Sequence, residues 1–308
     1  MKLAAFPKAF IDEISSGAMP LAEWIDVGAT LDVEGLELYE HFFASFEPSY
    51  LDAVGEWLQA KGLAMPMLCC SPDFTHPDPR ARSAAIAREI ELIAVARHLG
   101  GPGVACRVLS GQRHPGVSRA DGVRWVLQAF DELLPVAREL QVVLALENHY
   151  KDGGWRYPEF AQHREVFLEI LDAIDERTWF GVQYDPSNAL VAGDDPVDFL
   201  RVVLDRVVTM QASDRALAPG ATLEDLRQDD GTLGYSPLLH HGIVGQGLND
   251  YRAIFALLRG RGYDGWISIE DGVNGLDEMV QSLAFLRDMI DESAPSGERA
   301  GSRREVSE

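Results

Sequence analysis

The chain has 308 residues, of which 46% are hydrophobic and 25% charged, a composition typical of a globular protein with a large core. Its 49 acidic residues outnumber the 27 basic ones, which gives a formal net charge of −22. A surface this acidic repels nucleic-acid phosphates and anionic lipid headgroups, so the charge argues against a nucleic-acid or membrane partner. Length alone fits two domains, but one α/β barrel commonly fills a chain of this size.

The cysteines and the N-terminal segment indicate the compartment. Cys69, Cys70 and Cys106 form no CxxC pair and no disulfide framework, which suits a reducing environment, and we expect them to be small buried residues near strands. The opening MKLAAFPKAF lacks the apolar stretch of a signal peptide, and no run approaches the ~20 apolar residues that span a bilayer. The sequence therefore predicts a cytoplasmic protein.

Short apolar segments recur along the chain and predict the strands of a parallel sheet that is covered on both faces. In chain order they are a weak segment within Phe6–Ile11, then Gly35–Tyr39, Ala64–Cys70, Gly103–Leu109, Val142–Glu147, Trp179–Asp185, Val207–Gln211 and Trp266–Glu270.

Amphipathic segments lie between the predicted strands. Ala81–Leu99, Asp121–Leu140 and Asp250–Gly260 carry apolar residues at helical spacing. Strands that alternate with helices imply a parallel sheet with right-handed crossovers, and eight such units favour a closed barrel. No GxGxxG motif follows the first strand, so nothing supports a dinucleotide-binding half. We expect a single (β/α)₈ TIM barrel over residues 1–290.

Two segments interrupt this alternation. Arg215–Gln246 is a long loop, rich in Gly, Asp and His, after the seventh strand, and loops of that length usually act as lids or contact partners. The polar segment 291–308 has almost no apolar residues, and we expect it to be a disordered tail.

Polar residues collect where the later strands end. Glu147 ends the fifth predicted strand, Asp185 the sixth, Gln211 the seventh and Glu270 the eighth. In a (β/α)₈ barrel these ends meet at the active-site face. Each carboxylate taken singly also fits a helix cap or a salt bridge. Three converging carboxylates repel one another unless a cation lies between them, and an all-oxygen ligand set suits Mg²⁺ or Mn²⁺.

Other residues are candidates for contact with a substrate. His149 shares a strand face with Glu147, and a histidine with a pKa near ~6.5 can exchange protons at neutral pH. His149 is a catalytic base, a contact to a sugar hydroxyl, or a hydrogen-bond partner of a metal-ligating residue. Arg107 either binds a substrate oxygen or pairs with Glu147. Asn188 is a substrate contact or the cap of the sixth helix, and His241 is a substrate contact or a solvated lid residue.

Several motifs together resemble the xylose isomerase-like barrel superfamily. They are EWIDVGATLDVEGLELY at 23–39, LENH at 146–149, YDPSN at 184–188, QASD at 211–214, GIVGQG at 242–247 and ISIED at 267–271. They look most like its sugar phosphate isomerase/epimerase branch, and the resemblance runs from about residue 1 to 290. The same branch includes the larger subunit of the C-glycoside deglycosidases.

The resemblance implies a metal held by Glu147, Asp185, the residue at 211 and Glu270. It also implies that the two glutamates act as acid and base across the plane of the sugar. The family usually has His where this chain has Gln211. Because an amide oxygen is a harder ligand than an imidazole nitrogen, we expect Mn²⁺, with Mg²⁺ or Co²⁺ as alternatives.

The function predicted from these residues is a divalent-metal-dependent isomerase or epimerase. It would remove a proton next to the carbonyl of a ketose or keto-sugar and pass through an enediolate. The alternatives are a metal-dependent lyase or C-deglycosidase subunit that acts on 3-keto-glycosides, and a non-catalytic sugar-binding barrel. A DNA-repair endonuclease is disfavoured by the acidic charge. The expected partners are a sugar or sugar glycoside and either further copies of the chain or a second subunit.

Overall fold

The computed structural model describes residues 1–222, 224–225, 237–270 and 272–293. Its strands are β1 (Lys2–Ala5), β2 (Gly35–Leu36), β3 (Leu38–Tyr39), β4 (Met67–Cys69), β5 (Ala105–Val108), β6 (Val143–Glu147), β7 (Phe180–Tyr184), β8 (Val207–Ala212), β9 (Arg215–Leu217), β10 (Leu239–His241) and β11 (Trp266–Ile269). Its helices are η1 (Lys8–Phe10), α1 (Ile11–Ser15), α2 (Leu21–Gly28), η2 (Glu40–Phe42), α3 (Pro48–Ala60), α4 (Pro79–Gly100), α5 (Arg119–Leu140), α6 (Arg164–Ala173), α7 (Pro186–Val191), α8 (Pro196–Val203), η3 (Leu204–Arg206), α10 (Tyr251–Arg261) and α11 (Leu276–Ser293).

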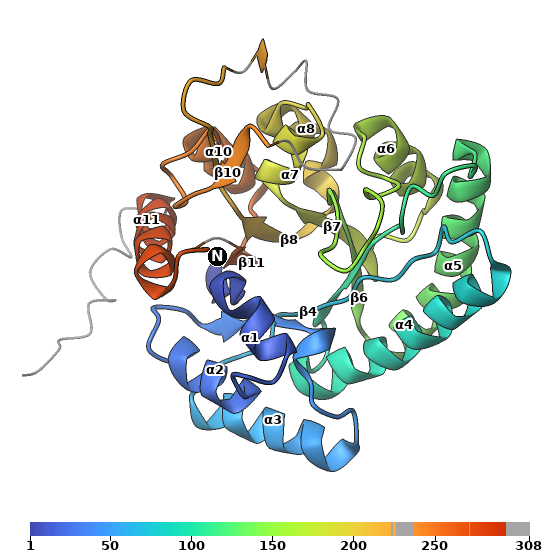
Figure 1. Cartoon of the computed structure of the whole chain (residues 1–308). Coiled ribbons are helices and arrows are strands. Elements are labelled where there is room, and N and C mark those ends of the chain that lie inside the picture. Colours follow the sequence, from blue (N-terminus) through green and yellow to red (C-terminus); the bar gives the residue numbers. More distant parts are fainter. Residues whose placement is uncertain (223, 226–236, 271, 294–308) are drawn as a thin grey trace, which may run out of the picture.

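The main sheet is parallel, in the order β2-β1-β11-β8-β7-β6-β5-β4-β3, and it curls into a barrel. Its two ends meet in one segment, Gly35–Tyr39, whose first half pairs with β1 and whose second half pairs with β4. The break between the halves falls at Glu37. The predicted (β/α)₈ TIM-barrel fold is confirmed (Figure 1).

The helices surround the strands, so the core lies both inside the barrel and between the barrel and the helices (Figure 1). Several helices begin at a residue whose side chain accepts a backbone N–H of the first turn, which satisfies an otherwise unpaired donor. These capping residues are Asp78, Ser118, Asp185, Asp195 and Asp250. Among the described residues no helix is long and apolar enough to cross a membrane.

The first strand is where the sequence prediction was wrong. The strand is Lys2–Ala5, and the residues predicted to form it, Phe6–Ile11, turn instead into η1 and the start of α1. Pro7 explains the shift, because it has no backbone N–H to continue the ladder and its fixed φ suits the start of a helical turn.

Two segments that were predicted to interrupt the alternation contain some regular secondary structure. The loop at 215–246 contains β9 and β10, which pair antiparallel, while residues 223 and 226–236 lie outside the described residues. Helix α11 continues to Ser293, past the predicted start of the tail at 291, and residues 294–308 lie outside the description.

We predict that Gly181→Ala destabilises the barrel. Gly181 lies in β7, and a Cβ built there would lie 2.6 Å from the backbone oxygen of Arg206 and would also overlap the side chain of Val208. Overpacking of this kind costs about 1–3 kcal/mol of unfolding free energy, measurable by urea denaturation. Gly260→Ala is the matched control, since Gly260 is exposed on α10 with open space around it. This control should lose no stability, and an equal loss in both variants would contradict the packing argument.

Candidate metal centre

Three carboxylates converge at the carboxyl end of the barrel strands. Glu147 is the last residue of β6, Asp185 follows β7 and Glu270 follows β11. One carboxylate oxygen of each lies within 4.8 Å of the others, and the three side chains are almost wholly buried. Buried anions at this separation repel one another strongly, so the arrangement suits a bound cation.

Two basic residues contact the carboxylates of Glu270 and Glu147. Lys8 Nζ lies 2.7 Å from Glu270 Oε1, and Arg107 Nη1 donates to Glu147 Oε2 at 3.1 Å. Asn188 Nδ2 donates to the other oxygen of Glu147 at 2.9 Å. Each glutamate is therefore fixed in direction by side chains that reach it from neighbouring elements.

Asp185 keeps one oxygen for a ligand. Its Oδ1 accepts the backbone N–H of Asn188 at 2.9 Å, which caps α7, and the hydroxyl of Ser213 at 2.7 Å. Its Oδ2 is buried and has no hydrogen-bond partner among the described residues. A buried acceptor without a donor is costly, and a cation beside Glu147 and Glu270 would satisfy it.

The pKa values of the three carboxyl groups differ in direction. Burial raises the pKa of Glu147 well above its ordinary value, and burial together with the charge of Glu270 raises the pKa of Asp185 to about 7. Burial also acts against ionisation of Glu270, but the adjacent ammonium of Lys8 outweighs it and lowers that pKa to about 2. A divalent cation would favour the ionised form of all three.

Gln211 points its amide into the same region. Its Nε2 donates to Glu37 Oε2 at 2.9 Å, while its Oε1 is buried and without a hydrogen-bond partner among the described residues. The hydrogen bond to Glu37 thus fixes the orientation of the Gln211 amide and leaves Oε1 available to a ligand. Burial raises the pKa of Glu37 to about 8. The three carboxylates and the amide of Gln211 offer oxygen ligands, as a hard divalent ion prefers, and the Cys69 thiol also lies here, 3.9 Å from Gln211 Nε2.

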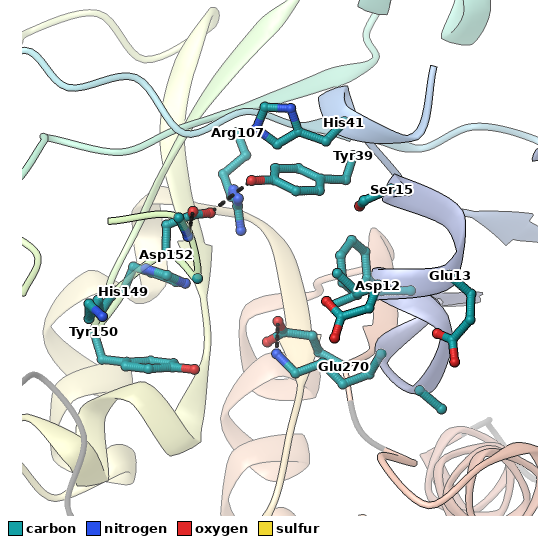
Figure 2. A pocket seen from close by; sticks show the side chains of 17 residues that line it. Asp12, Glu13, Ser15, Tyr39, His41, Arg107, His149, Tyr150, Asp152 and Glu270 are labelled. Carbon is teal, nitrogen blue, oxygen red and sulfur yellow. Dashed lines mark hydrogen bonds and ion pairs between the residues drawn. The ribbon is translucent and has the colours of Figure 1, made fainter. Parts of the chain in front are cut away.

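A cavity of about 670 Å³ lies beside the centre, and of the three carboxylates Glu270 lines it. Its walls come from the segment after β1, from α1 and from the loop after β6, and Glu270 lies between α1 and the His149–Tyr150 segment (Figure 2). Asp152 on one wall accepts the hydroxyls of Tyr39 at 3.0 Å and Ser71 at 2.7 Å. The cavity has the size of a small-molecule site and is lined by charged and hydroxyl groups.

His149 lines the cavity, but its pKa is not the one expected from the sequence. Burial, and after it the positive charge of Arg107, lowers the pKa of His149 to about 3, so the imidazole is neutral at pH 7. The ring stacks on Tyr150 at a centroid distance of 5.0 Å, and its buried Nδ1 has no hydrogen-bond partner among the described residues. A neutral imidazole can accept a proton or a hydroxyl hydrogen bond here.

The remaining candidates lie at different distances from the cavity. Arg107 lines it and pairs with Glu147, so the structure shows the pairing that the sequence left open. Asn188 does not cap its helix, because Asp185 occupies the capping position and Asn188 binds Glu147 instead. His241 lies in β10, outside the cavity lining, with Nε2 3.4 Å from Arg215 Nη2.

Sequence reasoning missed two residues of this centre. Lys8 follows the true first strand, and the rule that located the carboxylates would have found it had that strand been placed at Lys2–Ala5. Glu37 is a lone carboxylate within the apolar run GLELY, and its position inside a predicted buried strand was the available signal.

The chain was compared with known proteins. The sequence profile described as Xylose isomerase-like TIM barrel matches residues 25–289. No curated protein matches at a significant level. Among solved structures, a D-tagatose 3-epimerase-like protein has 16% identity and a TM-score of 0.74 over 95% of this chain and 98% of the other.

Two further solved structures share this fold. D-psicose 3-epimerase from Clostridium cellulolyticum H10 has 14% identity and a TM-score of 0.71, over 94% of this chain and 98% of the other. The 3-keto-D-glucoside 4-epimerase YcjR from E. coli has 17% identity and a TM-score of 0.65, over 94% of this chain and 99% of the other.

We predict that Lys8→Met destabilises the metal-free protein by roughly 3–5 kcal/mol, because it leaves Glu270 buried without its cation. If the carboxylates hold a divalent ion, added Mn²⁺ should recover much of this loss. Urea denaturation with chelator and with Mn²⁺ measures both effects. Lys61→Met, which removes an exposed ion pair with Asp26, is the control and should change stability by less than ~1 kcal/mol. Equal losses in the two variants would contradict a buried ion pair at Glu270.

Proposed function

Because the chain belongs to the xylose isomerase-like TIM barrel family, we propose that it is a divalent-metal-dependent isomerase or epimerase of a ketose or keto-sugar. One observation carries the proposal. Three buried carboxylates converge within 4.8 Å of one another, and one of their oxygens, Asp185 Oδ2, lacks a hydrogen-bond partner among the described residues. The fold shared with two sugar epimerases supports a sugar as the substrate.

In this proposal Glu147, Asp185, Gln211 and Glu270 hold the metal. The all-oxygen set favours Mn²⁺, with Mg²⁺ or Co²⁺ as alternatives. A divalent ion bound there supplies a Lewis acid that polarises a substrate carbonyl and the hydroxyl beside it.

The residues of the chain divide the remaining work. Glu147 and Glu270 remove a proton from the carbon next to the carbonyl and later return one. Return to the neighbouring carbon gives isomerisation, and return to the same carbon from the opposite face gives epimerisation. Arg107 and Lys8 hold these two carboxylates in direction. Their positive charges also favour the enediolate, an anion, over the neutral substrate.

Three other residues bind the sugar in this proposal. The neutral imidazole of His149 accepts a hydrogen bond from a sugar hydroxyl. Its role as a catalytic base stays a prediction, which its pKa of about 3 disfavours. Asn188 and His241 stay predicted contacts of the sugar. The amide of Asn188 lies beside Glu147, and His241 lies in β10.

A lyase that acts on 3-keto-glycosides is the second candidate. The cavity is lined by α1, with Asp12 and Glu13, and by the loop at 151–154, and its volume of about 670 Å³ lies in the range of sites for drug-sized ligands, which supports a substrate larger than a single sugar. The same proton abstraction next to a keto group would then expel a leaving group in place of reprotonation. The variant Glu147→Ala distinguishes a non-catalytic sugar-binding barrel from the isomerase and from the lyase. In either enzyme it abolishes turnover, whereas in a binding protein it only weakens sugar binding.

Assembly of the chain with itself or with a second subunit stays a prediction. Light scattering on protein purified under native conditions tests it, and a tightly bound second polypeptide would favour the lyase.

We predict that Asp185→Asn abolishes metal-dependent proton exchange. The assay is proton NMR in D₂O with Mg²⁺-loaded protein, offered free ketoses and 3-keto-glycosides, in which a C–H signal next to a carbonyl disappears with time. Loss of one metal ligand removes several kcal/mol of transition-state stabilisation, so the exchange rate should fall at least ~100-fold. Exchange with ketoses or with 3-keto-glycosides identifies the substrate class.

Asp195→Asn is the matched control. Asp185 and Asp195 each cap a helix that begins with Pro, and each accepts the N–H three residues on at 2.9 Å, but Asp195 is exposed. Asn is as good a cap as Asp, so both variants keep their helices and only Asp185→Asn loses a metal ligand. Wild-type exchange that survives chelation, or equal activity in the two variants, would overturn the proposal.

A further inference from the structure

A second buried cluster of metal-ligating side chains lies on the other side of the barrel wall. Cys70 directly follows β4, Cys106 lies in β5 and Glu89 lies on α4, which packs over these strands. Side chains alternate along a strand, so Cys106 faces α4 while its neighbour Arg107 faces the barrel interior. The cluster is thus separate from the carboxylates of the candidate metal centre.

The distances within the cluster are those of ligands around one tetrahedral ion. The two Sγ atoms lie 3.7 Å apart, Cys106 Sγ lies 3.5 Å from Glu89 Oε1, and one ligand atom of each residue lies within 4.8 Å of the others. Zinc bonds of ~2.3 Å to sulfur and ~2.0–2.2 Å to oxygen, at tetrahedral angles, separate two sulfurs by roughly 3.8 Å and sulfur from oxygen by roughly 3.5 Å. Both observed distances agree with these values.

Glu89 is a buried carboxylate that accepts a hydrogen bond from the Cys106 thiol. It is 1% exposed, on the face of α4 that also buries Ile86 and Leu92, and no ion pair among the described residues includes it. Burial raises the pKa of Glu89 to about 8. A glutamate in this position costs stability unless a cation or a proton compensates it.

We propose that Cys70, Cys106 and Glu89 bind one Zn²⁺ ion. The two thiols and the Glu89 carboxyl release their protons to solvent as the ion binds, and a soft sulfur pair selects zinc over the hard ions suited to the carboxylate centre. The fourth position is left to a water molecule. Glu40 lies near Cys70, since it accepts the backbone N–H of Ser71, but its ligand atoms are not among those within 4.8 Å of one another, and its other oxygen lies 3.7 Å from Arg88 Nε.

The ion would stabilise the strands that position Arg107. Cys70 O accepts a hydrogen bond from Arg107 Nε at 3.2 Å, and Cys106 precedes Arg107 in β5. Zinc would therefore tie together β4, β5 and α4 directly behind the guanidinium that holds Glu147. Its role is structural, and the proposal does not depend on the proposed reaction.

The test is replacement of zinc by Co²⁺, supplied during expression in minimal medium so that the buried site fills as the chain folds. Cobalt bound to thiolates gives an intense sulfur-to-metal charge-transfer absorption that cobalt bound only to oxygen lacks. We expect this band in the wild-type protein and in Asp185→Asn, and its loss in Cys70→Ser and Cys106→Ser. Cys69→Ser is the matched control, because Cys69 lies next to Cys70 on the opposite face, and it should keep the band.

Glu89→Gln keeps both thiols, and it should weaken cobalt binding by at least the ~10-fold that even a group behind a metal ligand contributes. The Glu89→Gln variant also tests the zinc site if the cysteine variants do not fold. Absence of the thiolate band from cobalt-grown wild-type protein would overturn the proposal and assign the short distances to S–H hydrogen bonds. Retention of the band in Cys106→Ser, or unchanged affinity in Glu89→Gln, would overturn it equally.

Discussion

The candidate centre depends on the burial of three carboxylates within 4.8 Å of one another. Ionised carboxylates at that separation in a water-poor interior are strongly unfavourable unless positive charge compensates them. The surrounding structure supplies part of it, through Lys8 at Glu270 and Arg107 at Glu147. The unsatisfied Oδ2 of Asp185 shows where compensation is incomplete. A divalent cation would complete the compensation, which is why the proposed chemistry centres on a metal rather than on any single residue.

The two glutamates are not equivalent, and their partners make the difference. Glu270 contacts an ammonium and has a low pKa, whereas burial raises the pKa of Glu147 even though Arg107 contacts it. The difference holds for the metal-free centre, because a bound divalent cation would favour the ionised form of both. The barrel produces this difference from residues that lie far apart in the sequence, since Lys8 follows the first strand and Glu270 the last.

The sequence predicted the carboxylates because parallel strands end at one face, so an acidic residue after an apolar run has a known location. It did not predict Lys8, because the first strand was placed within Phe6–Ile11, which includes Lys8, rather than at Lys2–Ala5. It gave His149 an ordinary pKa, since burial beside Arg107 arises only when β5 and β6 pair. The identity of the cap was missed for a similar reason: Asp185 and Asn188 both suit capping, and only the position of Glu147 decides between them.

In the proposed reaction, the chemistry and the choice of substrate depend on different parts of this barrel. The proposed metal ligands lie in strands or directly after them, where hydrogen bonds between neighbouring strands restrict movement. The cavity walls come largely from α1 and the loop after β6, including Asp12 and the segment 151–154. In the proposed reaction, changes in those walls would alter which sugar or aglycone fits while the carboxylates keep their partners. The cavity lining would then select the substrate, and the substrate would decide between reprotonation and loss of a substituent.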